Sequence, residues 1–178
     1  MVSIRLQDFG AVGDGVTDDT LAFHRAISEL GRIGGGTLIV NGGDLLSPIH
    51  YRSLPIALVS NMIFLIEKGV TISAINDESR WPMHDPYPSY AAKGDYQQAQ
   101  GFLGGTDIKN VTIVGQGKKS IVNGYGDYWW KQVREKTLQH QPPHLIQFTN
   151  AQDIRIRNLK LVDSPAWNVH LYTCDRAQ

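Results

Sequence analysis

The stretch that decides the fold is KNVTI at residues 109–113, because its pattern recurs elsewhere in the chain. SNMIF at residues 60–64 and QDIRI at residues 152–156 repeat its order: a polar residue, Asn or Asp, an apolar residue, any residue, an apolar residue. The Asn or Asp positions lie 49 and 43 residues apart, and LIQFT at 145–149 aligns with VHLYT at 169–173 at a spacing of 24. Repeats of this length that carry only short strands are typical of a solenoid, whose coils bury their apolar faces against one another.

Short β-prone segments separated by polar or glycine-rich turns occupy most of the chain after residue 36. Such strands are also compatible with a sandwich or a barrel, but the self-similarity favours a solenoid. We therefore predict an all-β fold, a right-handed single-stranded parallel β-helix that forms one domain. A surface loop is expected near residues 80–101, where Pro82, Pro86, Pro88 and Gly94 occur. The predicted strands are 37–40, 57–59, 62–66, 70–73, 111–114, 145–148, 154–156, 159–161 and 169–172.

The opening segment, DFGAVGDGVTDDT at residues 8–20, is rich in acids and glycines. It fails the template of a calcium-binding EF-hand loop, because no glycine follows Asp18, and it lacks the GK[ST] end of a phosphate loop. A turn at residues 13–15 and a helix capped by Thr17 or Asp18 account for it better.

A helix is predicted after this turn, because five apolar residues follow at helical spacing. They are Ala22, Phe23, Ala26, Ile27 and Leu30. Gly31 is expected to end the helix before the strand at 37–40. Residues 1–35 are thus predicted to form a turn and a capping helix, and residues 36–178 the first coils of the solenoid.

The composition excludes several function classes. Lys+Arg and Asp+Glu are balanced at 17 each, so no net charge attracts nucleic acid or an anionic membrane. Cys174 is the single cysteine, which excludes an intrachain disulfide and a cysteine-based zinc cluster. Residues 1–10, MVSIRLQDFG, contain no apolar run of signal-peptide length.

The last seven residues, YTCDRAQ at 172–178, align with FTNAQDI at 148–154. The chain therefore stops where the next strand is expected to begin, with no capping segment after it, although solenoid ends normally carry one. We interpret the chain as the N-terminal portion of a longer solenoid. Self-association through the uncapped C-terminal coil is expected.

Several ordered motifs resemble the polygalacturonase-like glycoside hydrolases across nearly the whole chain. The opening segment, the helix and GGGTLIV at 34–40 resemble the start of right-handed parallel β-helix proteins, among them pectin-degrading enzymes and some phage tailspikes. Four later stretches narrow the resemblance: EKGVTI at 67–72, GQG at 115–117 with GYGDYWW at 124–130, PHLIQF at 143–148 and NLKLVDSPAWNVH at 158–170. They are similar to the family elements LEKGATL, GEGTIDGQGxxWW, RPxLIxF and NLTLxNSPFWTxH.

The resemblance implies an inverting hydrolase of pectic polysaccharide, with one carboxylic acid and one carboxylate base on opposite sides of the scissile bond. The family carries these groups in NTDGxD and GDD segments, followed by a histidine in GHG, and these three strings are absent from the chain. No catalytic residue is therefore assigned, and neither a metal nor an organic cofactor is implied. Relatives are usually exported, yet residues 1–10 carry no export signal, so the sequence assigns no compartment. The alternative is a non-catalytic, carbohydrate-binding or tailspike-like β-helix module.

Five aromatic and imidazole side chains are the candidates for substrate contact. Trp129 and Trp130 offer rings on which a sugar can stack. Trp167 and His170 lie, by the family resemblance, one coil before the catalytic cleft. Since side chains alternate along a strand, His170 and Tyr172 are expected to point outward into a groove, while Val169 and Leu171 point to the other face.

Overall fold

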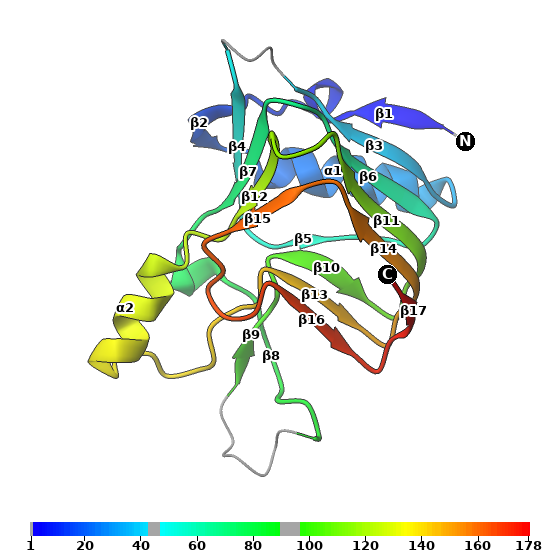
Figure 1. Cartoon of the computed structure of the whole chain (residues 1–178). Coiled ribbons are helices and arrows are strands. Elements are labelled where there is room, and N and C mark those ends of the chain that lie inside the picture. Colours follow the sequence, from blue (N-terminus) through cyan, green and yellow to red (C-terminus); the bar gives the residue numbers. More distant parts are fainter. Residues whose placement is uncertain (1, 43–46, 90–96) are drawn as a thin grey trace.

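The computed structural model describes residues 2–42, 47–89 and 97–178, which wind as successive coils into three parallel sheets (Figure 1). Sheet A consists, in spatial order, of β1 (Ser3–Arg5), β3 (Gly36–Val40), β6 (Met62–Ile66), β11 (Lys109–Gly115), β14 (Gln152–Arg157) and β17 (Asp175–Ala177). Sheet B consists of β2 (Asp14–Asp18), β4 (Ile49–Ser53), β7 (Val70–Ala74), β12 (Ser120–Asn123) and β15 (Lys160–Val162). Sheet C consists of β5 (Ile56–Ala57), β10 (Leu103–Thr106), β13 (Ile146–Thr149) and β16 (Val169–Tyr172). The predicted parallel β-helix is confirmed.

The three repeated segments found in the sequence are neighbours in sheet A. Val111 pairs with Met62 on one side and with Ile154 on the other, as the alignment of the repeats predicts. These side chains point into the coil and are fully or almost fully buried. Asn61, Asn110 and Asp153, which precede them, have φ of 60°, 56° and 56°. Asn and Asp tolerate this left-handed conformation better than other non-glycine residues, which explains the second position of the repeat.

The alignment of the last two coils requires a correction of one residue. The structure pairs Ile146 with Val169 and Phe148 with Leu171, a spacing of 23 rather than 24 residues. A slip of one residue would exchange the inward and outward faces of a strand. With the observed register, polar Gln147 lies beside His170, and the apolar pairs face the interior. β17 has also begun, because Asp175 pairs with Gln152.

Helix α1 (Thr20–Arg32) closes the N-terminal end of the coil (Figure 1). Its five predicted apolar residues are all buried, and the ring of Phe23 lies 6.2 Å from that of Phe64 inside the coil. Two details of the prediction are wrong. Thr17 belongs to β2 rather than to a helix cap, although Asp18 does accept the N–H of Thr20 at 3.0 Å. Gly31 lies inside the helix, which continues to Arg32.

The opening acids organise the loop before α1. The Asp19 carboxylate is buried and accepts the N–H groups of Val12 and Gly13 at 2.7 and 3.3 Å. Burial raises the pKa of this carboxyl, and the three backbone donors around it, Arg52 included, act in the opposite direction. Asp14 accepts the N–H groups of Val16 and Thr17, which closes the turn that the glycines permit. These acids are structural.

Two long excursions leave the coil at the same corner, between sheets B and C. The first, after β7, contains the short helix η2 (Glu78–Arg80) and the antiparallel pair β8 (Met83–His84) and β9 (Gln98–Ala99). The second, after β12, contains helix α2 (Asp127–Glu135), which the sequence did not predict. The expected loop near 80–101 is therefore partly regular, and residues 90–96 of it lie outside the described residues. No helix within the described ranges is long and apolar enough to cross a bilayer.

Candidate functional site

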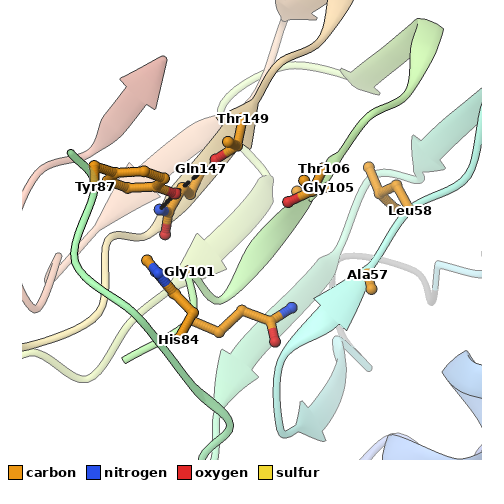
Figure 2. A pocket seen from close by; sticks show the side chains of 11 residues that line it. Ala57, Leu58, His84, Tyr87, Gly101, Gly105, Thr106, Gln147 and Thr149 are labelled. Carbon is orange, nitrogen blue, oxygen red and sulfur yellow. Dashed lines mark hydrogen bonds between the residues drawn. The ribbon is translucent and has the colours of Figure 1, made fainter. Parts of the chain in front are cut away.

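The outer face of sheet C carries a hollow. The pairing of the strands places Ala57, Gly104, Gln147 and His170 in one outward row across the sheet. Ala57 and Gly104 contribute almost no side chain, so the row is deep at β5 and β10 and filled at β13 and β16. A cavity of about 450 Å³ results (Figure 2). It is lined by Ala57, Leu58, His84, Tyr87, Gln100, Gly101, Gly104, Gly105, Thr106, Gln147 and Thr149.

Glycine is required at two positions in the floor of this cavity. Gly104 has a φ of 155°, and a Cβ atom there would clash with the backbone oxygen of Gln147. A Cβ atom on Gly101 would clash with the side chain of Gln147. Backbone conformation and close approach thus both exclude larger residues, which keeps the cavity open.

A segment of the first excursion lies directly on sheet C. We call residues 83–89 the arm. The Tyr87 hydroxyl lies 2.6 Å from the hydroxyl of Thr149 and also accepts a hydrogen bond from the amide of Gln147, and Figure 2 shows these groups pointing toward one another. The ring of Tyr87 stacks on that of Tyr172, with centroids 4.1 Å apart and planes inclined by 23°. Within the described part of the chain, the buried amide oxygen of Gln147 has no hydrogen-bond partner.

Two histidines extend the site toward the last coil. His144 lies 4.3 Å from His170, ring centre to ring centre, and its ring stacks on Trp167 at 5.3 Å. The Nδ1 atom of His144 accepts the N–H of Trp167 at 3.3 Å, so in the neutral ring Nε2 carries the proton. Nε2 lies 2.9 Å from the side-chain amide nitrogen of Gln98, and rotation of this amide by 180° would bring its oxygen to the N–H as an acceptor.

These histidines are held neutral. Burial, followed by the neighbouring His170 and His84, lowers the pKa of His144 to about 4. The pKa of His170 is also lowered, chiefly by burial and then by His84. Removal of an imidazolium from water disfavours the charged form. At neutral pH this part of the face therefore presents uncharged polar and aromatic groups.

Three of the five predicted contact residues come together here. Trp167 is 58% exposed, Tyr172 is half-buried, and His170 points to the outer face as predicted. His170 is however only 3% exposed, because the rings of Tyr87, Trp167 and His144 surround it. Val169 and Leu171 point to the opposite face, as the alternation predicts.

Trp129 and Trp130 lie elsewhere, on α2. Trp129 is completely buried, packs edge-on against Trp81 at 5.3 Å and donates to Asn76, so it leaves no ring face for a ligand. Trp130 is 41% exposed and donates its indole N–H to the carbonyl oxygen of Ser164. The prediction of sugar contact is therefore not supported for Trp129 and stays a prediction for Trp130.

The sequence analysis missed Tyr87, Gln147 and Thr149. The register of β13 offers a signal for two of them, since Gln147 and Thr149 alternate with the inward-facing Ile146 and Phe148. Tyr87 belongs to an irregular segment between prolines and gives no periodic signal.

The described residues determine which metal ligands and outward-facing carboxylates this part of the face carries. They contain no group of three or more His, Cys, Asp or Glu side chains that suits a metal ion. The seven outward positions of sheet C that the strand pairing defines are Ala57, Gly104, Thr106, Gln147, Thr149, His170 and Tyr172, without an acid among them. The functional groups at these outward positions of sheet C are therefore hydroxyl, amide, imidazole and aromatic side chains.

The fold defines a parallel β-helix protein of the pectin-lyase-like kind, with three sheets and an open outer face. The sequence model of glycosyl hydrolases family 28 matches residues 60–177, about two thirds of the chain. The chain belongs to this family.

Individual relatives agree with this assignment. A probable polygalacturonase from Vitis vinifera is 36% identical over 176 residues, which covers 94% of this chain and 34% of the relative. The structure of a hyperthermoactive exopolygalacturonase from Thermotoga maritima aligns with a TM-score of 0.77 at 25% identity, over 99% of this chain and 45% of that one. A family 28 exopolygalacturonase from Yersinia enterocolitica shares the fold, with a TM-score of 0.76 at 13% identity over 97% of this chain and 37% of that one. The chain spans about a third of the length of the curated relatives it matches.

Proposed function

We propose that the protein to which this chain belongs hydrolyses glycosidic bonds in pectic polysaccharide, with inversion at the anomeric carbon. The membership of family 28 over residues 60–177 carries the proposal, and the similarity to polygalacturonases supports it. Inverting hydrolysis uses a general acid and a general base whose carboxyl groups are about 6.5–9.5 Å apart. We place these carboxylates outside the 178 residues.

The outer face of sheet C is the part of the substrate groove that this chain contributes. Further coils would continue the face beyond β16, so that the groove runs across the strands along the axis of the solenoid. Trp167 and Tyr172 would contact sugar rings through their aromatic faces, which suit the C–H patches of a pyranose. The neutral His170 would support these rings from beneath rather than exchange a proton.

The full-length product of the gene tests this function. Release of reducing ends from polygalacturonate, with the inverted anomer seen first by NMR, is the expected result. The 178-residue chain alone is expected to give no turnover. Binding of polygalacturonate by the full-length product without any release of reducing ends would instead support the non-catalytic carbohydrate-binding module.

A further inference from the structure

We infer that the arm is a wall across the groove on sheet C, and that this wall makes the enzyme act at chain ends, with Tyr87 as the specificity-determining residue. The inference rests on the proposed function. It concerns how a polymer enters the groove and adds a role for a segment to which the family motifs assign none.

No space remains between Tyr87 of the arm and the sheet. Tyr87 hydrogen-bonds Thr149 of β13 at 2.6 Å and stacks on Tyr172 of β16 at 4.1 Å. These are van der Waals and hydrogen-bond distances, and no sugar ring fits between groups that touch. A polysaccharide that ran along the outer face over Thr149 and Tyr172 would have to pass through Tyr87.

The arm is anchored at its base. β8 pairs with β9, and the N–H of Gln100 donates to the carbonyl oxygen of Pro82 at 2.9 Å. Trp81 is 3% exposed and packs against the buried Trp129 of the second excursion. Displacement of the arm would therefore disturb buried aromatic packing, which opposes its movement away from the sheet.

The two sides of Tyr87 differ in the groups that they offer to a sugar. On the β16 side, Trp167 offers an exposed ring beside His170, a platform for a terminal sugar. On the β10 side, the cavity of about 450 Å³ continues the hollow of the groove behind the wall. Tyr87, Gln147 and Thr149 separate these two spaces, so removal of the Tyr87 ring would join them into one passage.

The position of the wall also limits the product. Neighbouring coils are spaced by about 4.8 Å, close to the advance of one sugar along a 1,4-linked uronan. The resemblance places the catalytic coils directly after β16. Roughly one or two sugar units then fit between the wall and the scissile bond, so mono- and disaccharides are the expected early products.

The experiment compares the full-length protein with its Tyr87→Ala and Tyr87→Phe variants on polygalacturonate. Reducing ends and solution viscosity are followed together, and early products are separated by size. The wild type should release short products while the viscosity falls little. Tyr87→Ala should cause a several-fold larger loss of viscosity per reducing end and give longer products, whereas Tyr87→Phe, which keeps the ring, should retain the wild-type pattern.

Each outcome has one meaning. Steep viscosity loss by the wild type overturns the inference but leaves the proposed function intact, while absence of reducing ends from all three proteins overturns the proposed function itself. If the wild type and a folded Tyr87→Ala variant both released short products from chain ends, the result would show that Tyr87 does not form the wall. If Tyr87→Ala loses its thermal transition, the wild-type product pattern still decides whether the groove is closed.

Discussion

Equivalent inward-facing side chains are buried to different extents at the two ends of the solenoid. Ile146 and Phe148 point inward from β13 and are fully buried. Their direct partners in the last coil, Val169 and Leu171, point the same way but are 37% and 42% exposed. At the other end, α1 covers the first coils and its inward residues are buried.

This difference shows that an inward position in a solenoid is buried by the coil that follows it, and not by its own strand. Stability in such a fold is close to a sum of coil and interface contributions. The alternation of residues along a strand therefore predicts the direction in which a side chain points, whereas the burial of that side chain depends on the neighbouring coil. Mutations at matched positions of the two ends can test this directly.

The largest effect is expected at Phe148. Its truncation to alanine leaves a cavity in a closed part of the coil and should lower the free energy of unfolding by about 3–5 kcal/mol. Leu171→Ala, at the paired position in the last coil, should cost about 1 kcal/mol, because nearly half of the side chain already contacts water. Urea unfolding of the two variants measures both values, and equal losses would refute the comparison.

A pH effect tests whether the last coil stays packed on the previous one. The ring of Trp167 covers His144, whose pKa is lowered to about 4, so the unfolded chain binds the extra proton below pH 6.5. Stability should therefore fall as the pH decreases from 6.5 toward 4, by up to roughly 1.4 kcal/mol per pH unit from this residue.

The same direction holds for His50 and His170, whose pKa values burial also lowers. His144→Gln should reduce the slope, as urea unfolding at several pH values would show. NMR titration of His144 gives the independent check. A pKa near 6.5 would mean that the last coil does not protect it.

A smaller effect concerns association of the 178-residue chain. β15, β16 and β17 are the last strands of their sheets, and Val169 and Leu171 lie exposed between them. Unpaired strand edges beside apolar side chains promote pairing with another chain. Sedimentation should show concentration-dependent association, and Leu171→Lys should weaken it. A monomer at every concentration for the unmodified chain would contradict this expectation.

The smallest effects are expected at surface ion pairs. Arg32 pairs with Glu29 inside α1, whereas Arg176 binds both carboxylate oxygens of Asp153 and so ties β17 to β14. Exposed pairs contribute little to global stability. Arg32→Gln should leave the urea midpoint unchanged, and Arg176→Gln should only accelerate amide exchange in β17. Faster exchange throughout sheet A would mean that the last strand supports the whole coil.

The coils were predictable from the sequence because their signals are local. Alternating apolar residues mark the strands, and Asn or Asp marks the left-handed residue where the chain enters β6, β11 and β14. The predicted strands omit β4, β10 and β12, although buried and half-buried residues alternate along β12 and the end of β4.

The candidate site was predictable only in part. Trp167, His170 and Tyr172 lie in or beside a regular strand, and the alternation rule placed them correctly. Tyr87 and Thr149 are 62 positions apart in the sequence, and Tyr87 lies in an irregular segment. Their contact therefore leaves no periodic pattern in the sequence. α2 was missed because its tandem tryptophans were interpreted as a surface motif, whereas Trp129 is a core residue of the second excursion.

The corners of the coil differ in the length of the segments that connect consecutive strands. The turn from sheet C to sheet A takes four residues after β5, 58–61, and two residues in each later coil: 107–108, 150–151 and 173–174. The two longest connecting segments, 75–102 and 124–145, lie instead between sheets B and C, beside the outer face of sheet C (Figure 1). Segments exchanged between β7 and β10, or between β12 and β13, would thus change what borders the groove while the pitch of the scaffold stays constant. Grafting at this corner would therefore alter the borders of sheet C without altering the stacked strands.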